Sequence, residues 1–422
     1  MNFSVDIYST LALAAAALVI GHALVDRIAF LKRYSIPDAV VGGMLFAAAV
    51  TALRAAGVGL EFDPALITPL NIAFFTTVGL SADARSLAKG GKLLLLFFAV
   101  VAGGLALQNV VGVGLARLFD IHPMNGLLAG SITLSGGHGT GAAWAGKFIE
   151  ERNLQGAVEL AVACATYGLV AGGLLGGPLA GWLIRRHGLS AAADGAAPAS
   201  SVAAPATAAA ARTGAASAAT ANPVTPAAAD EPLPLRRLIE TLLLVFASMA
   251  IGMALYGLLG QGAFTLPSFI WALLVGAVIR NLLSLSGLYR VNDKAVDTIG
   301  ALSLSLFLAM IIMTLKLWEL VDLAGPIIAI LLVQTAVMLA YVAFVTFRVM
   351  GGNYDAALLA TGHLGFSMGS TATAMVNVQA VAERYGHSPL AFLLIPVMGA
   401  FLIDVANALI IQGFLTLPWF GL

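Results

Sequence analysis

The chain has 422 residues, of which 60% are hydrophobic and only 10% are charged, and its formal net charge is zero. This composition excludes an ordinary soluble domain, and the neutral charge gives no electrostatic reason to expect nucleic-acid binding. Apolar segments of about 20 residues recur along the chain, as helices that cross roughly 30 Å of hydrocarbon require. The sequence therefore predicts an all-α, polytopic membrane protein embedded in a lipid bilayer.

In chain order, we expect about ten transmembrane helices. The first apolar segment lacks the basic start of a signal peptide, and the second follows at once, so we expect the first to be retained as a helix. The expected spans cover residues 8–25, 37–56, 66–82, 93–118, 157–184, 238–259, 267–286, 298–317, 325–348 and 390–417. Two Gly-rich segments remain, at 124–148 and 355–380, each near the end of one half of the chain.

A segment rich in Ala, Pro, Ser and Thr, residues 187–235, separates an N-terminal unit, 1–186, from a C-terminal unit, 236–422. This composition cannot build a core, which predicts a linker. Landmarks of the first unit recur about 231 residues later, as when GLLAGSITLSGGHGTGAAW, from Gly126, is echoed by ALLATGHLGFSMGSTATAM, from Ala357. The conserved order of these matches within the chain predicts an internal repeat of two five-helix units.

Lysine and arginine indicate the topology, because positive residues accumulate in cytoplasmic loops. If each Gly-rich segment enters the membrane and returns to the same side, 16 of the 21 basic residues lie on one side and five on the other. A complete crossing by the first segment would mix the two groups. We therefore expect two re-entrant hairpins, 124–148 and 355–380, in units of inverted topology. Both termini are then periplasmic, and the linker is cytoplasmic.

The break in each hairpin is the candidate binding site. Non-helical backbone at membrane depth is tolerated only where it is buried in protein or lines a watery cavity. Helix N-termini in such a cavity attract an anion, while glycines let the backbone approach a ligand. The alternative, close helix packing through small residues, needs neither a histidine nor hydroxyl groups. The candidate substrate-binding residues at the breaks are Ser135, Gly136, Gly137, His138, Gly139, Thr140, Ser370, Thr371 and Thr373.

The last expected span contains FLIDVANALII, in which Asp404 and Asn407 lie three residues apart on one helical face. A carboxylate in an apolar span is costly and usually functional, and no lysine or arginine inside a span offers a partner. We expect Asp404 to hold a cation, either sodium or a substrate ammonium group, with Asn407 beside it in the substrate site. The candidate sodium ligands are Asp404, Asn377, Ser370 and Thr133.

Other polar residues in the spans have simpler interpretations. His138 and His363 have no second histidine or carboxylate at metal-ligand spacing, so we expect hydrogen bonding rather than a metal site. Gln108, Asn109 and Gln334 are more typical of interhelical hydrogen bonds than of ligand contacts.

With these stretches and NYDAALLATGHLGF and AVAERYG, the sequence resembles the bacterial sodium/glutamate symporter family over nearly the whole chain apart from the linker. The resemblance implies sodium-coupled import of L-glutamate across a bacterial inner membrane, with sodium as coupling ion and no other cofactor. It also implies a homodimer, two inverted halves of five helices with re-entrant loops, and an elevator-like movement of the substrate-carrying part.

Three other functions are less favoured. A sodium symporter for a dicarboxylate or related organic anion is the closest alternative, because an amide-lined anion site does not itself identify an amino acid. A channel is less favoured because one carboxylate between two dissimilar hairpins fits an occluding site better than a pore. An enzyme is disfavoured because Asp404 has no second buried aspartate, and Ser135 with His138 lacks an orienting group.

Overall fold

The computed structural model describes residues 2–34, 36–190, 233–259, 266–316 and 324–418. The first unit comprises β1 (Asn2–Val5), α1 (Ile7–Arg27), α2 (Ala29–Arg33), α3 (Asp38–Ala55), β2 (Gly59–Phe62), α4 (Ile67–Leu80), α5 (Ala84–Leu118), α6 (Pro123–Leu127), the π-helical turn η1 (Leu128–Ile132), α7 (Gly137–Arg152) and α8 (Ala157–His187). The second comprises α9 (Leu235–Leu259), α10 (Ser268–Ser286), α11 (Asp293–Met313), α12 (Ala324–Tyr341), η5 (Val342–Thr346), α13 (Phe347–Val349), α14 (Tyr354–Met368), α15 (Thr371–Tyr385), α16 (Pro389–Val397), η6 (Met398–Leu402) and α17 (Ile403–Leu415).

Each of the ten expected spans contains a helix. Within the described ranges, nine helical segments are long and apolar enough to cross a membrane, which confirms the prediction of a polytopic helical membrane protein. The tenth, α4, has only 14 residues, or about 21 Å at 1.5 Å per residue, which is less than the bilayer core. Every residue from Asn71 to Leu80 is buried, so α4 is surrounded by protein and does not need the full length.

Some boundaries differ from those expected. Helix α5 begins at Ala84 rather than near residue 93, because it continues across a kink at Gly91, whose φ of 56° and ψ of −149° are not helical. Helix α8 continues through His187, one residue beyond the expected end of the first unit. Most of the expected linker, 191–232, lies outside the described residues. A short parallel pair, in which Asn2 to Val5 of β1 align with Gly59 to Phe62 of β2, is an addition to the otherwise helical fold.

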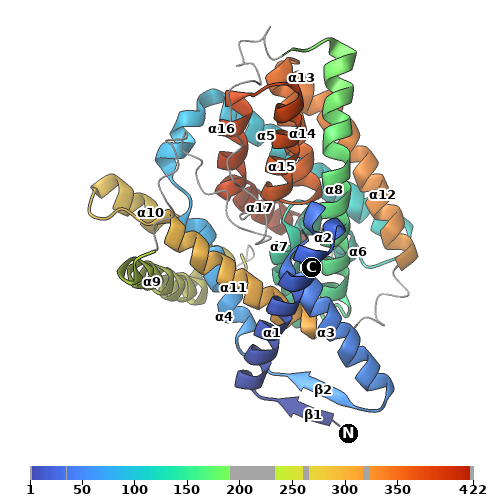
Figure 1. Ribbon diagram of the computed structural model, residues 1–422, viewed down its shortest axis with the longest axis vertical. Helices are drawn as coiled ribbons and strands as arrows, with labels where there is room; N and C mark the ends of the chain where they lie inside the picture. The colour runs from blue at the N-terminus through green and yellow to red at the C-terminus, as the bar shows by residue number, and fades with distance from the viewer. Residues whose placement is uncertain (1, 35, 191–232, 260–265, 317–323, 419–422) are drawn as a thin grey trace.

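The helices pack as two bodies. The helices of the first three expected spans of each unit, α1, α3 and α4 with α9, α10 and α11, pack together and form what we call the six-helix body. The remaining helices, α5–α8 and α12–α17, form the hairpin body. Figure 1 shows α9 and α10 at the left of the view with α4 and α11 beside them, and the green and orange-to-red helices of the hairpin body above and to the right. The two bodies meet where α11 contacts α7 and α8 and where α4 contacts η6.

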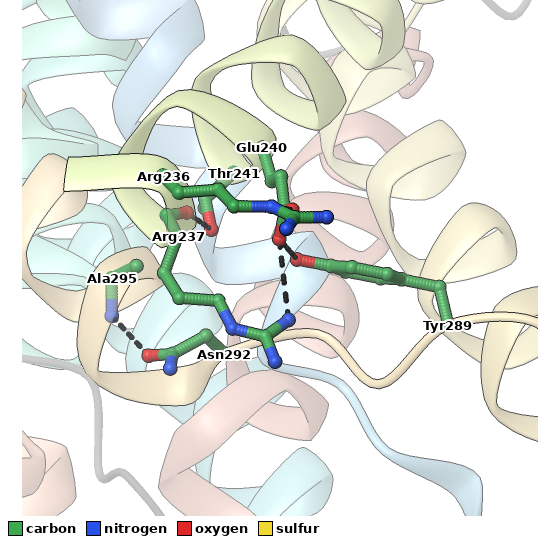
Figure 2. Close-up of polar contacts among 7 residues, drawn as sticks. All are labelled: Arg236, Arg237, Glu240, Thr241, Tyr289, Asn292 and Ala295. Carbon is green, nitrogen blue, oxygen red and sulfur yellow. Dashed lines mark hydrogen bonds and ion pairs between the residues drawn. The ribbon is translucent and has the colours of Figure 1, made fainter. Parts of the chain in front are cut away.

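A polar cluster attaches the start of α9, directly after the linker, to the connection between α10 and α11 (Figure 2). The Glu240 carboxylate accepts hydrogen bonds from Arg236 Nε at 2.7 Å, Arg237 Nη1 at 3.2 Å and the Tyr289 hydroxyl at 2.8 Å. The Arg237 guanidinium also lies 5.9 Å from the centroid of the Tyr289 ring. Asn292 follows in the same connection and caps α11 by accepting from Ala295 N. These contacts join three helices of the six-helix body at one end.

Candidate functional site

The first Gly-rich segment forms two short helical pieces joined by an irregular turn. The π-helical turn η1 contains Gly130, whose φ of −104° and ψ of −137° are not helical. The chain then turns, and α7 begins at Gly137 with a φ of 68°, in the left-handed region that favours glycine. The free N–H groups of the first turn of α7 therefore start within SGGHGTG.

The second Gly-rich segment is also broken at its centre. Helix α14 ends at Met368, and α15 begins at Thr371, with Ser370 as its N-cap. The Ser370 hydroxyl accepts from Thr373 N at 3.3 Å, which satisfies one amide of the first turn. The two breaks adjoin each other, because a Cβ atom on Gly137 would lie 3.4 Å from the carbonyl oxygen of Gly369.

A cavity of about 90 Å³ lies where the two breaks meet α4, α8 and the η6–α17 segment. The N-terminal turns of α7 and α15 both line it. Its polar lining is completed by Asp404, and Phe74, Phe75 and Val78 of α4 line it from the six-helix body. The predicted site residues that line this cavity are Ser135, Gly136, Gly137, His138, Gly139, Thr140, Ser370, Thr371 and Asp404.

Asp404 contributes the carboxylate to this lining. Among the residues that the structure describes, its carboxylate has neither a hydrogen bond nor an ion pair. Two helix N-termini, hydroxyl groups and one unpaired carboxylate thus surround the same small volume. Such a site can hold a ligand that carries both negative and positive charge.

Gln108 of α5 connects the two breaks and is fully buried. Its Oε1 atom accepts from the Ser135 hydroxyl at 2.7 Å, and its Nε2 atom donates to the carbonyl oxygen of Ser367 at 2.7 Å. Its own carbonyl oxygen accepts from Gln334 Nε2 at 2.6 Å. The prediction that Gln108 and Gln334 make interhelical hydrogen bonds is confirmed, and Gln108 holds the turns of both breaks at once.

A model of a known protein family, described as Sodium/glutamate symporter, matches residues 3–387. The chain belongs to the sodium/glutamate symporter family. It is 46% identical over 425 residues to the sodium/glutamate symporter of Escherichia coli (strain K12), an alignment that covers 99% of this chain and 100% of the relative. The corresponding protein of Haemophilus influenzae (strain ATCC 51907 / DSM 11121 / KW20 / Rd) is 41% identical over 413 residues and 98% of each chain. These matches confirm the resemblance inferred from the sequence motifs.

In this member of the symporter family, four predicted site residues lie behind the cavity lining. Thr133 donates to the carbonyl oxygen of Leu128 at 2.6 Å, and Thr373 contacts Ser370 as described above. The Asn377 Nδ2 atom donates to Gly172 O on α8 at 3.0 Å. Asn407 Nδ2 donates to Ser131 O at 3.0 Å. These side chains hold the backbone of the hairpins and of the helices next to them.

The two histidines of the Gly-rich segments of this symporter are both hydrogen-bonded. His138 lines the cavity, with its Nε2 atom 3.0 Å from the Thr166 hydroxyl of α8. His363 lies inside the hairpin body, with its Nδ1 atom 2.9 Å from the Thr346 hydroxyl. Within the described ranges, no group of three His, Cys, Asp or Glu side chains could hold a metal ion.

The α4 side of the cavity was not predicted from the sequence. Phe74 and Phe75 lie in an apolar span, where aromatic residues are expected as ordinary packing. Their role as cavity walls depends on which face of α4 meets the hairpin body. Gln108 was singled out as an amide inside an apolar span, but its contact with both breaks was not predicted.

Proposed function

We propose that the protein is a sodium-coupled secondary transporter that imports L-glutamate across a bacterial inner membrane. The observation that carries this proposal is the convergence around one cavity of the α7 and α15 N-termini with the Asp404 carboxylate, which has no partner among the described residues. Glutamate carries two carboxylates and one ammonium group, so its charges are complementary to this lining. The relatives that match the chain over nearly its full length are named sodium/glutamate symporters.

The hairpin amides and hydroxyls bind the carboxylates of the substrate in this proposal. Gly137 and Gly369 leave the backbone open to the ligand, and Thr140 and Ser370 add hydroxyl groups. The hydroxyl groups of Ser135 and Thr371 instead donate to Gln108 Oε1 and Gly399 O. Asp404 provides the opposite charge for sodium or for the substrate ammonium group. A binding pocket typically measures 300–1,000 Å³, whereas this cavity measures about 90 Å³. Loading glutamate therefore requires the lining elements to separate.

We propose that this separation is an elevator-like movement of the hairpin body along the six-helix body. The cavity lies where the two bodies meet, with α4 on one side and both breaks on the other. Contacts within each body are far more extensive than those between the bodies. That division lets one body move as a unit while its internal packing is preserved.

The division into bodies also supports an inverted repeat with two re-entrant hairpins. Each unit places the helices of its first three expected spans in one body and a broken Gly-rich segment in the other. Gly21 and Gly252, 231 positions apart, each allow the first helix of a unit to cross closely over the second. Periplasmic termini and a cytoplasmic linker follow from the distribution of basic residues, and the homodimer rests on the family resemblance.

Uptake into proteoliposomes tests the proposed function directly. With sodium outside and potassium inside, we expect purified protein to concentrate radiolabelled L-glutamate well above equilibrium. Replacing external sodium with choline should reduce uptake to the level of empty vesicles, because the coupling ion is then absent. Sodium-driven uptake of a dicarboxylate without glutamate uptake would favour the organic-anion alternative instead.

We expect Gln108→Leu to reduce glutamate uptake at least tenfold. The substitution replaces the amide with an apolar side chain of similar size, which leaves the Ser135 hydroxyl and the Ser367 carbonyl without their common partner. The two breaks therefore lose the residue that fixes their spacing. Initial uptake rates in proteoliposomes at matched protein content would measure the loss. Gln412→Leu is the control, because Gln412 is a buried glutamine of α17 whose Oε1 atom has no hydrogen-bond partner among the described residues. Equal activity of the two variants would show that Gln108 does not position the breaks.

A further inference from the structure

A second polar cluster lies one helical turn beyond Asp404 along α17. It consists of Asn407 of α17, Ser131 of η1 and Asn109 of α5, whose exposed fractions are 1%, 0% and 0%. Asn407 Nδ2 donates to the Ser131 carbonyl oxygen at 3.0 Å, and Ser131 N donates to Asn109 Oδ1 at 3.1 Å. The three residues therefore touch one another at the point where the first hairpin, α5 and α17 meet. None of them lines the cavity described above.

Two oxygen atoms of this cluster lack a hydrogen-bond partner among the described residues. They are the hydroxyl Oγ of Ser131 and the amide Oδ1 of Asn407, and both are inaccessible to solvent. Native proteins pair nearly all buried polar groups with protein, water or an ion. Unpartnered oxygens on two hydrogen-bonded neighbours therefore point to a ligand beside them, where the first hairpin meets α17.

The chemistry of the unpartnered atoms favours a cation as that ligand. The Ser131 carbonyl is not available, because it already accepts from Asn407 Nδ2, Ser135 N and Gly136 N. Hydroxyl and amide oxygens are ligands that hard cations accept. In transporters, coupling ions bind at unwound helix segments beside the substrate cavity. The π-helical turn η1, with its non-helical Gly130, is such a segment in this protein. Water is the other candidate, since Asn109 Nδ2 is an unpartnered donor in the same cluster.

We propose that Ser131 Oγ and Asn407 Oδ1 are ligands of a sodium ion, at a site separate from the cavity that Asp404 lines. Asp404 is then left to bind the ammonium group of the substrate. This inference rests on the proposed function as a sodium-coupled glutamate transporter. Sodium at this position links the first hairpin to the helix that carries Asp404. Binding of sodium therefore stabilises the arrangement that binds glutamate, and the coupling is reciprocal.

Sodium-dependent thermal stability, measured on purified protein without glutamate, tests the site. Sodium chloride is titrated against choline chloride at constant ionic strength, and the sodium concentration that gives half of the Tm increase is recorded. We expect Ser131→Ala and the similarly sized Ser131→Cys to raise this concentration at least tenfold, because neither side chain offers a hard oxygen.

The control for the Ser131 variants is Ser248→Ala. Ser248 is also fully buried, but its hydroxyl donates to Leu244 O within α9, away from the cluster. A sodium midpoint that stays at the wild-type value in both Ser131 variants would overturn the sodium site and leave water as the bridging ligand. That result would leave the proposed function standing if the wild-type protein still shows sodium-driven uptake. Uptake by the wild-type protein that ignores sodium would instead overturn the proposed function itself.

Discussion

Gly137→Val is expected to lower glutamate uptake to below about one hundredth of the wild-type rate. Gly137 opens α7 with a φ of 68°, a conformation that costs an L-residue roughly 1–2 kcal/mol and a β-branched residue more. A valine side chain would also enter the cavity beside the carbonyl oxygen of Gly369. Both effects remove the open backbone that the anion site requires. Initial uptake rates in proteoliposomes would measure the loss.

The matched control is Gly146→Val, in the same helix. Gly146 lies within α7, and a Cβ atom there would have no neighbour within 4 Å. This variant should transport at close to the wild-type rate. Size-exclusion chromatography of both variants would show whether the folded protein is still made. Wild-type uptake by a well-folded Gly137→Val variant would mean that the glycines of the first break serve helix packing rather than substrate binding.

Asp404→Asn is expected to weaken glutamate binding at least tenfold, or about 1.4 kcal/mol. The substitution preserves the shape of the side chain but removes its charge. The Asp404 carboxylate lines the cavity and has no partner in the described part of the chain, so the lost attraction falls on the ligand. The concentration of glutamate that gives half-maximal uptake, measured at saturating sodium, would report the change.

Two comparisons identify which cation Asp404 binds. If it binds the ammonium group, the affinity for glutamate should fall much more than the affinity for glutarate, a dicarboxylate that lacks the amino group. The affinity for glutarate is measured by its competition with glutamate uptake. If it binds sodium, the variant should instead need more sodium for half-maximal uptake. Asp355→Asn serves as the control, because Asp355 accepts from the Ser388 hydroxyl outside the cavity and asparagine retains an acceptor. Unchanged glutamate and sodium dependence in Asp404→Asn would remove Asp404 from the site.

The sequence by itself determined the helical segments, the two breaks and the exceptional position of Asp404. Each depends on local properties. A run of apolar residues forms a helix in a bilayer because its backbone amides have no other partner, so ten such runs contain ten helices. Glycine, serine and threonine within an otherwise apolar segment mark a break for the same reason. A single carboxylate in such a span is visible without knowing its neighbours.

Only the tertiary structure decided which residues surround the cavity. Asn407 and Asp404 share a helical face in the sequence, yet Asp404 lines the cavity and Asn407 binds a backbone carbonyl of η1. Phe75 of α4 and Gln108 of α5 become part of the site through the rotation of their helices against the hairpin body. A polar side chain at membrane depth can be satisfied by a ligand, a side chain or a carbonyl from any neighbouring helix. Which of these it meets depends on partners hundreds of residues away in the chain, such as Ser131 for Asn407, and not on the local pattern.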